Sequence, residues 1–264
     1  MRFGRQGLDS CGPVSGRLLP RTWGVTMALK DYRAKRRFTV TAEPQGKKKP
    51  SARRRKALIF VVQKHRATAL HYDFRLEWAG MLLSWAVPKG PSLDPSVKRL
   101  AMQVEDHPIE YADFEGIIPE GEYGGGTVMV WDKGTWTPES PDVSAGLKKG
   151  DLKFTLDGKK LEGSWVLVRT GGRYQGGKRA WLLIKHRDEH ASTRDIAEAR
   201  PRSVVSERLL VEIARDEGGD MAKAVTGDPP ALLKKLVRDP RLITPPKRKG
   251  RKKLVWHSNK TIGS

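Results

Sequence analysis

The sequence has 264 residues, a formal net charge of +21 and a hydrophobic content of 38%, which is enough to bury the core of one ordinary domain with polar extensions. Its single cysteine, Cys11, excludes an intrachain disulfide framework and a cysteine-rich zinc site, and it fits a reducing cytoplasm. The chain has no apolar run of about 18 residues, the length that a membrane-spanning helix needs, so we expect no membrane among its partners.

The positive charge is concentrated at the two ends of the chain. Residues 1–57 contain 16 Lys and Arg against 3 Asp and Glu, and residues 245–264 contain 7 against none, whereas residues 58–244 contain 28 against 27. Basic clusters of this kind gain free energy when they release counterions from phosphates, so they favour a nucleic acid as partner. A solubilising tail and an acidic membrane are the alternatives, and the lack of an apolar face along the basic runs disfavours the membrane.

In chain order, the composition predicts four parts. Residues 1–57 form a disordered basic arm and linker, although two aromatic residues of the segment 27–43, Tyr32 and Phe38, could pin that segment to the folded body. Residues 1–26 are either a disordered leader or an upstream extension of the reading frame, because they lack the apolar segment of a secretory signal. Residues 58–190 form the folded domain, residues 191–244 a helical extension, and residues 245–264 a basic tail.

Residues 58–190 contain many short stretches with the period-two alternation of β-strands, separated by Gly, Pro and Asp-Gly turn signals. The predicted strands are Leu58–Val62, His71–Trp78, Met81–Val87, Arg99–His107, Thr127–Trp131, Thr135–Thr137, Leu152–Leu156, Trp165–Val168 and Trp181–Ile184. Short antiparallel strands in such a series are typical of a barrel or a sandwich. We therefore predict a mainly β fold with a few short helices on its periphery.

Reactive side chains gather on one face of the second predicted strand, because polar and apolar residues alternate along it. The polar set is His71, Asp73, Arg75 and Glu77, and the apolar set is Tyr72, Phe74, Leu76 and Trp78. His65 follows the preceding apolar run and joins the polar face if the intervening residues turn. Two imidazoles and a carboxylate with open positions are ligands for Mn, Fe or Zn. The alternative is that His65, His71 and Asp73 are ordinary polar residues on a half-exposed strand.

Three cationic residues, Arg75, Lys89 and Arg99, accompany this predicted metal site. The planar fork of arginine matches phosphate oxygens and lysine adds a point charge, so cations beside a metal favour a phosphoryl substrate. Alternatively, they pair with nearby carboxylates, as most surface charges do. The alternation from Arg99 to His107 predicts a strand that presents Arg99, Glu105 and His107 on one face.

A glycine-dense loop, Gly121–Gly126, precedes the strand Thr127–Trp131. It is not a Walker loop, because it lacks Gly-Lys-Ser/Thr and leads into a strand. We expect a tight turn here, with a backbone surface for a nucleic-acid strand as the alternative. The chain also lacks a Lys-x-Asp-Gly adenylation motif, which argues against ligation by this polypeptide alone.

Four segments, Gln63–Glu77, Ser84–Asp94, Glu105–Gly116 and Ile118–Gly126, carry long motifs such as Leu-His-Tyr-Asp-Phe-Arg-Leu-Glu and Pro-Glu-Gly-Glu-Tyr-Gly-Gly-Gly. In this order they resemble the 3′-phosphoesterase module of bacterial DNA ligase D. The similarity covers roughly residues 32–181. Motifs of polymerase and ligase modules are absent from the sequence, so the chain resembles the stand-alone form of this module.

The resemblance implies a compact antiparallel β-barrel that trims DNA 3′ ends in non-homologous end joining, with Mn2+ as cofactor. In the family, a 3′-terminal ribonucleoside is removed by phosphodiester cleavage and a 3′-phosphate by phosphomonoester cleavage, which leaves a 3′-hydroxyl. The implied partners are primer–template DNA with a 3′-phosphate or 3′-ribonucleotide, and a separate DNA ligase or polymerase. We expect a monomer in the cytoplasm, associated with the nucleoid.

Carried over by position, the resemblance also assigns the residues of the site. The metal ligands would be His65, His71 and Asp73. The residues around the scissile phosphate would be Arg75, Lys89, Arg99 and His107, supported by Glu105 and Tyr111. We predict that His107 is the general acid toward the leaving 3′ oxygen, because an imidazole can supply a proton near neutral pH.

The N-terminal arm departs from the family pattern at one position. Arg36, Arg37 and Phe38 stand where the family has Arg-Asp-Phe, whereas Glu43 is retained. The arm is associated with the ribonucleoside step, for which Arg36 and Glu43 are the assigned residues. Because Arg37 replaces an acidic residue, removal of the 3′-phosphate is the better supported of the two predicted reactions.

Two other functions compete with this prediction. A His-x-Asp pair followed by a distal histidine is also found in non-haem iron oxygenases, with His107 or His186 as the third ligand here. The cations and basic arms argue against an oxygenase. The other alternative is a catalytically inactive accessory protein that binds DNA.

Overall fold

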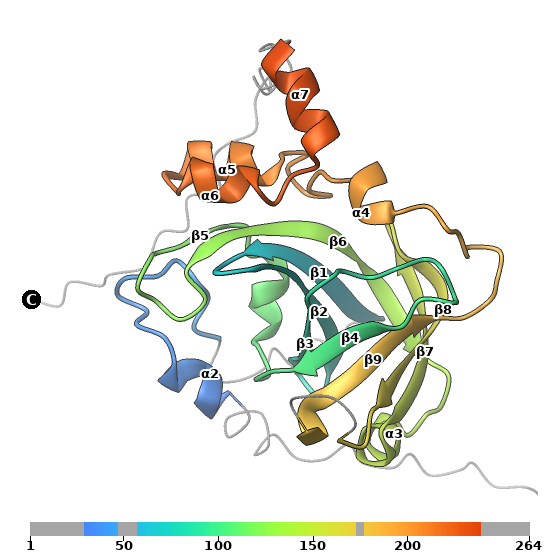
Figure 1. Cartoon of the computed structure of the whole chain (residues 1–264). Helices are drawn as coiled ribbons and strands as arrows, with labels where there is room; N and C mark the ends of the chain where they lie inside the picture. Colours follow the sequence, from blue (N-terminus) through green and yellow to red (C-terminus); the bar gives the residue numbers. More distant parts are fainter. Residues whose placement is uncertain (1–28, 47–56, 173–176, 239–264) are drawn as a thin grey trace, which may run out of the picture.

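The computed structural model describes residues 29–46, 57–172 and 177–238, and in this part nine strands form one antiparallel sheet (Figure 1). The strands are β1 (Leu58–Arg66), β2 (Leu70–Trp78), β3 (Met81–Val87), β4 (Arg99–Gln103), β5 (Gly116–Ile118), β6 (Gly126–Pro138), β7 (Asp151–Gly158), β8 (Glu162–Arg169) and β9 (Ala180–Lys185). The helices are α2 (Lys30–Ala34), η1 (Ile109–Asp113), α3 (Val143–Lys149), η2 (Gly177–Arg179), α4 (Ile196–Ala199), α5 (Leu210–Glu217), α6 (Met221–Val225) and α7 (Pro230–Arg238). The leader and basic tail predicted at residues 1–26 and 245–264 lie outside the described residues.

The strand β1 closes the sheet into a barrel, because it pairs with β2 on one side and with β6 on the other. The order β1-β2-β3-β4-β9-β8-β7-β6 thus forms a ring of eight strands, and β5 adds to β6. Closure pairs the N–H and C=O groups that an open sheet would leave at its edges. The predicted antiparallel β-barrel is therefore confirmed, and the sandwich alternative is excluded.

The barrel interior is filled by apolar side chains that alternate along the strands as predicted. On β2, Tyr72, Phe74 and Leu76 are buried in this core. They share the core with buried tryptophans from the other strands, which are Trp85, Trp131, Trp136, Trp165 and Trp181. Burying a side chain the size of phenylalanine stabilises a fold by roughly 1.5–3 kcal/mol. This burial fixes the register of β2 and directs its polar half to the outer face of the barrel.

A second, smaller core lies on the outer face of the barrel, where α2 and η1 pack against the wall. Tyr32 of α2 and Tyr111 of η1 are both buried there, with ring centroids 6.1 Å apart. Residues 29–46 are therefore docked on the barrel and not disordered, so the ordered structure begins before Leu58. The expectation that Tyr32 and Phe38 pin the arm to the body is confirmed. The physical reason is that the aromatic and aliphatic side chains of this segment are buried against the barrel wall.

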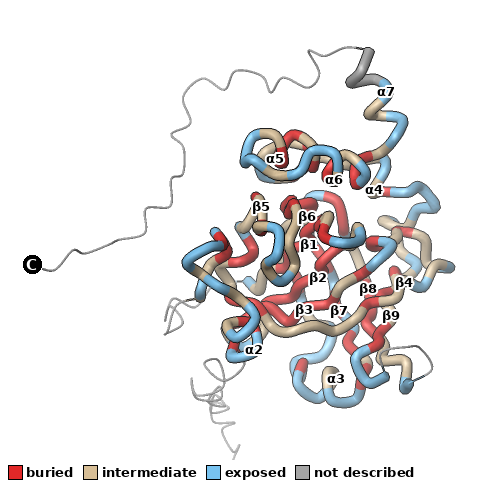
Figure 2. Tube along the Cα trace, turned by 60° about the vertical axis from the view of Figure 1, so that its left-hand side comes forward, coloured by how far each residue is buried: buried red, intermediate tan, exposed pale blue. Residues whose placement is uncertain are grey.

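The helices α5 and α6 cover one end of the barrel, and α3 lies at the other end (Figure 1). Leu210 and Ile213 of α5 and Ala224 of α6 join the barrel core. Asp228 accepts hydrogen bonds from the N–H groups of Leu210 and Val211 at 3.2 and 2.9 Å, which satisfies donors at the start of α5. Buried stretches follow the strands, whereas much of the outer helical layer is exposed (Figure 2). In the described ranges no helix has the length and apolar character needed to cross a membrane.

The strand predicted from Arg99 to His107 is wrong in its second half. β4 ends at Gln103 after only two residue pairs with β3. Ala101 is buried in the barrel core, so the face of β4 that carries Arg99 turns inward. Beyond Gln103 the chain leaves the sheet, and His107 returns to it through an isolated bridge to Leu82. His107 therefore lies on the outer face of the barrel, unlike Arg99.

Candidate active site

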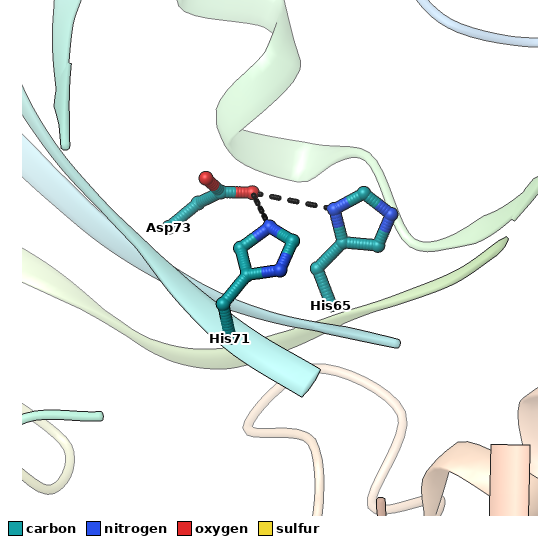
Figure 3. A group of neighbouring side chains, drawn as sticks. All are labelled: His65, His71 and Asp73. Atoms are coloured by element: carbon teal, nitrogen blue, oxygen red, sulfur yellow. Dashed lines mark ion pairs between the residues drawn. The ribbon is translucent and has the colours of Figure 1, made fainter. Parts of the chain in front are cut away.

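The three predicted metal ligands, here called the ligand cluster, come together on the outer face of β1 and β2 (Figure 3). His65 and His71 are opposite each other in the antiparallel register, and Asp73 follows His71 on the same face. Asp73 Oδ2 lies 3.5 Å from His65 Nδ1 and 3.7 Å from His71 Nε2. The ligand atoms all lie within 4.8 Å of one another, so a single cation can contact all three residues.

Backbone carbonyls select the tautomers of both imidazoles. His65 Nε2 lies 2.8 Å from the carbonyl oxygen of Gly124, and His71 Nδ1 lies 3.1 Å from that of Ala69. Because a carbonyl only accepts, these nitrogens carry the hydrogen in the neutral rings, and the opposite nitrogens present their lone pairs toward Asp73. Metal-binding histidines are commonly held in this way by their second nitrogen. The donor set therefore fits a divalent transition metal.

Asp73 is an ionised carboxylate although it is buried. Burial on its own would raise its pKa, but the Arg75 guanidinium, and the hydrogen bonds that His65 and His71 donate when their facing nitrogens are protonated, hold the pKa well below its ordinary value. The pKa of His71 is raised, because its interaction with Asp73 outweighs the effect of burial. The cluster therefore combines a fixed negative charge with imidazole nitrogens, and protons and metal ions compete for it.

Arg75 is buried and fixed by the barrel wall. Its Nε donates to Gln63 Oε1 at 2.9 Å, and its Nη1 donates to Ser84 Oγ at 2.8 Å. Gln63 is held in turn, since its Nε2 donates to the carbonyls of Tyr111 and Phe114 at 3.0 and 2.9 Å. The guanidinium Nη2 lies 3.2 Å from the carboxylate of the ligand cluster. Arg75 therefore supplies a preorganised positive charge beside the cluster.

His107 lies between two guanidinium groups. Its Nδ1 is 2.9 Å from Arg75 Nη1, and its Nε2 is 3.2 Å from Arg36 Nη2. The ring also contacts Tyr32 and Tyr111, at centroid distances of 4.9 and 4.7 Å. Burial and then the two cations hold the pKa of His107 well below its ordinary value. His107 is therefore a neutral imidazole as it stands.

The arm residues Arg36 and Glu43 are buried inside the site. Arg36 Nε lies 2.8 Å from Glu43 Oε1, and their side chains are 5% and 0% exposed. The hydroxyl of Tyr111 donates to the same carboxylate oxygen at 2.9 Å. Arg36 also pairs with Glu105 at 3.3 Å and lies over the Tyr32 ring, 3.9 Å from its centroid. The arm, η1 and the segment after β4 therefore meet at one guanidinium.

Arg37, where the arm departs from the family pattern, points away from this buried group. Its side chain is 70% exposed and pairs with Glu122 in the loop between β5 and β6. The Nε of Arg37 donates to Glu122 Oε1 at 2.8 Å. Two residues further along the same loop, Gly124 supplies the carbonyl that holds His65. The departure thus adds a contact between arm and loop and leaves the buried Arg36 group in place.

Lys89 and Arg99 make contacts other than those with the ligand cluster. Lys89 lines a pocket of about 250 Å³ together with Lys64 and Asp228, beside the C-terminal helices. Arg99 Nε is buried without a hydrogen-bond partner in the described structure. Within the described residues, neither cation forms a hydrogen bond or ion pair with the ligand cluster. No direct polar contact therefore joins these two members of the predicted phosphate-binding set to the ligand cluster in the described ranges.

Three groups that complete the site were not predicted. Gln63 and Ser84 hold Arg75, and the period-two pattern was sufficient to identify them, because Gln63 shares the histidine face of β1 and Ser84 pairs with Arg75 in register. The Gly124 carbonyl is different. A backbone oxygen leaves no signal in the residue types, so only the tertiary structure shows its contact with His65.

Comparison with known proteins assigns the central part of the chain to a known domain family. Residues 63–169 match the family described as the DNA Ligase D 3′-phosphoesterase domain. Through this domain, the chain belongs to the DNA ligase D 3′-phosphoesterase family, which confirms the resemblance seen in the sequence motifs.

Its relatives are longer proteins. The chain is 55% identical over 186 residues to the multifunctional non-homologous end joining protein LigD of Pseudomonas aeruginosa, covering 69% of this chain and 22% of the relative. It is 42% identical over 165 residues to the multifunctional non-homologous end joining DNA repair protein LigD of Mycobacterium tuberculosis, covering 62% and 20%. The LigD protein of Mycolicibacterium smegmatis is 39% identical over 166 residues, covering 61% and 21%. The chain thus spans about a fifth of the length of these relatives.

Proposed function

We propose that this chain is a metal-dependent phosphoesterase that removes a 3′-phosphate from DNA and leaves a 3′-hydroxyl for repair synthesis and ligation in non-homologous end joining. The observation that carries this proposal is the ligand cluster with the Arg75 guanidinium held 3.2 Å from Asp73. Two imidazoles and a carboxylate favour a transition metal, and a preorganised guanidinium beside them favours a phosphoryl group. The family match supports the same reaction class.

The residues divide the chemistry between them. His65, His71 and Asp73 would hold Mn2+, which in such a site polarises a phosphate oxygen and neutralises developing charge. Arg75 would bind another phosphoryl oxygen, because its guanidinium is preorganised at the edge of the cluster. Tyr111 supports the site from below, since its carbonyl holds Gln63 and through it Arg75.

His107 acquires its role when the substrate binds. In the free protein, Arg75 and Arg36 flank the ring, and burial together with these cations keeps it neutral. A phosphate dianion beside Arg75 would offset the positive charge and raise the pKa of His107. The imidazole can then take up a proton and deliver it to the leaving 3′ oxygen, which is the role of a general acid. Glu105 supports this arrangement through its ion pair with Arg36.

Removal of a 3′-terminal ribonucleoside is the second reaction that we propose for this site. The arm residues assigned to it, Arg36 and Glu43, form a buried pair beside His107. Arg37 lies outside this group and pairs with Glu122, so the loss of an acidic side chain at this position leaves the buried pair intact. This geometry supports the diesterase reaction more strongly than the sequence comparison of the arm does.

The test uses a primer–template with a 3′-phosphate, incubated with the protein and Mn2+ and followed by mass spectrometry of the primer. We expect loss of the phosphate with the wild type and no product with His71→Ala or Asp73→Asn. The matched control is His186→Ala, because His186 contacts Ser164 on β8 and should leave activity unchanged. No phosphate release by the wild type, or full activity in His71→Ala, would refute the proposal. DNA binding without any turnover would identify an inactive accessory protein instead.

The oxygenase alternative loses its predicted third ligand. His107 contacts Arg75 and Arg36, and His186 contacts Ser164, so neither imidazole joins the ligand cluster among the residues that the structure describes. Incubation with Fe2+ and an oxoacid cosubstrate separates the two functions, since only an oxygenase would consume the oxoacid.

A further inference from the structure

Tyr123 is a half-exposed aromatic side chain at the rim of the site. The residue is 49% exposed, a value close to the 51% of Val40 on the arm. A single exposed apolar side chain has no meaning by itself. The argument therefore depends on where this ring lies and on the groups around it.

The backbone ties Tyr123 to the ligand cluster. The next residue, Gly124, supplies the carbonyl that holds His65 Nε2 at 2.8 Å, so the loop cannot move far without disturbing this ligand. Space beside the loop is open, since a Cβ built on Gly121 would meet no atom within 4 Å. The loop therefore presents an aromatic ring next to a surface that another molecule can approach.

Cations connect the same ring to the catalytic groups. Lys35 Nζ lies 4.6 Å from the centroid of the Tyr123 ring, and the Arg36 guanidinium carbon lies 5.7 Å from it. Arg36 also reaches His107, with Nη2 3.2 Å from Nε2. A path of direct contacts thus runs from His107 through Arg36 to the exposed ring. Proteins bind single-stranded nucleic acids with this combination of an aromatic face and neighbouring cations. The bases stack on the ring and the phosphates pair with the cations.

We propose that Tyr123 stacks on the base of the 3′-terminal nucleotide, with Lys35 beside the adjoining backbone phosphate. This inference rests on the proposed function, because the ligand cluster must bind the 3′-phosphate of the same nucleotide. Every base has a π-face, so stacking would tolerate all four bases and discriminate against an end that lacks a base. Tyr123 is in this sense a specificity-determining residue that selects intact ends over abasic ends.

Steady-state kinetics on matched primers test the proposal. The primers carry a 3′-phosphate on either a normal terminal nucleotide or an abasic one. Tyr123→Ala should raise KM for the normal end by roughly 5- to 150-fold, the range that base stacking supplies, with little change in kcat. Tyr123→Phe keeps the ring and should resemble the wild type. Val40→Ala removes a side chain of similar exposure from the arm and serves as the control.

The abasic primer decides between stacking and a merely structural role. If Tyr123 stacks on the base, wild type and Tyr123→Ala should have the same KM on the abasic end. An equal rise in KM on both primers would show that the ring only supports the arm, and an unchanged KM on the normal primer would equally overturn the proposal.

Fluorescence separates failure of this inference from failure of the proposed function. A primer with 2-aminopurine as its terminal base changes its emission when that base stacks on a ring, whether or not phosphate is released. We expect the change on binding to wild type and Tyr123→Phe but not to Tyr123→Ala. Without turnover by the wild type, the proposed function fails and this signal still decides the stacking. The same signal in Tyr123→Ala would overturn the inference while phosphate release by the wild type continued.

Discussion

Arg36 is the residue whose removal should reveal how firmly the arm is docked. The Arg36→Ala substitution leaves Glu43 fully buried, with hydrogen bonds from Tyr111 and Thr41 but without the cation 2.8 Å away. Removing one partner of a buried ion pair costs about 3–5 kcal/mol, because the other charge remains buried without compensation. The substitution also removes the contact with Glu105. We therefore expect the free energy of unfolding to fall by about 3 kcal/mol or more.

The neighbouring Arg37 provides the control. Arg37→Ala removes the same type of side chain and the same charge, but its pair with Glu122 is 70% exposed on the arginine side. Exposed pairs contribute about 0–1 kcal/mol, so this variant should be close to the wild type. Urea unfolding can be followed by the fluorescence of the buried core tryptophans, such as Trp85 and Trp181.

The arm can also undock while the barrel stays folded, which tryptophan fluorescence would not detect. Hydrogen exchange at the amides of Arg33 and Val40 follows the arm itself, because these N–H groups bond to the carbonyls of Leu29 and Arg37. We expect faster exchange at both amides in Arg36→Ala and unchanged exchange in Arg37→Ala.

A double substitution isolates the buried charge as the cause. In an Arg36→Ala background, Glu43→Gln should recover part of the lost stability, because a neutral amide no longer requires the cation. Equal losses in Arg36→Ala and Arg37→Ala, or no recovery by Glu43→Gln, would refute the reasoning that the buried pair holds the arm in place.

Three further predictions concern other parts of the molecule. Because burial and two guanidinium groups depress the pKa of His107, the folded protein excludes a proton that the unfolded chain binds below about pH 6.5. The free energy of unfolding should therefore fall by about 1 kcal/mol over the pH unit below about 6.5 because of this group. In urea unfolding, His107→Gln should show a weaker dependence of stability on pH over that unit, and identical pH profiles for the variant and the wild type would contradict the prediction. Gly126→Ala places a Cβ 2.1 Å from the carbonyl oxygen of Arg66, where β6 pairs with β1 to close the barrel, so we expect a loss of about 1–3 kcal/mol in thermal unfolding. An unchanged melting temperature would show that the β1 backbone can move aside. Deleting residues 245–264 removes 7 Lys and Arg, so it should weaken DNA binding. The slope of the logarithm of the binding constant against the logarithm of the salt concentration should become shallower by up to about 6. An unchanged slope would mean that the tail does not contact DNA.

The sequence by itself determined which side chains of β2 enter the core and which lie on the face of the ligand cluster. Alternation along residues 71–77 has a period of two, and a slip by one residue would bury charges and expose aromatic rings, so the pattern permits one orientation of β2. His65 lies opposite His71 because β1 continues to Arg66, beyond the predicted end at Val62, and pairs with β2 in this register. Local periodicity was therefore sufficient for the two faces of β2 but not for the position of His65.

The rule failed where the chain leaves the sheet. Residues from Arg99 to His107 keep an alternating pattern, yet β4 ends at Gln103 and the face that carries Arg99 turns into the core. Alternation indicates which side chains share a face of a strand, but it does not indicate where the strand ends. The prediction that Arg99 and His107 share one face of a strand is therefore wrong.

The position of the arm was decided only by the tertiary structure. Arg36 contacts Glu105 and His107, which follow it in the chain by 69 and 71 residues. Tyr32 is buried against η1. No local pattern in a basic segment indicates such partners, because a charged side chain becomes part of a buried network only when the complementary groups are brought to it. Composition predicted a disordered arm and its two aromatic residues indicated a contact with the body, but only the packing makes residues 29–46 one wall of the site.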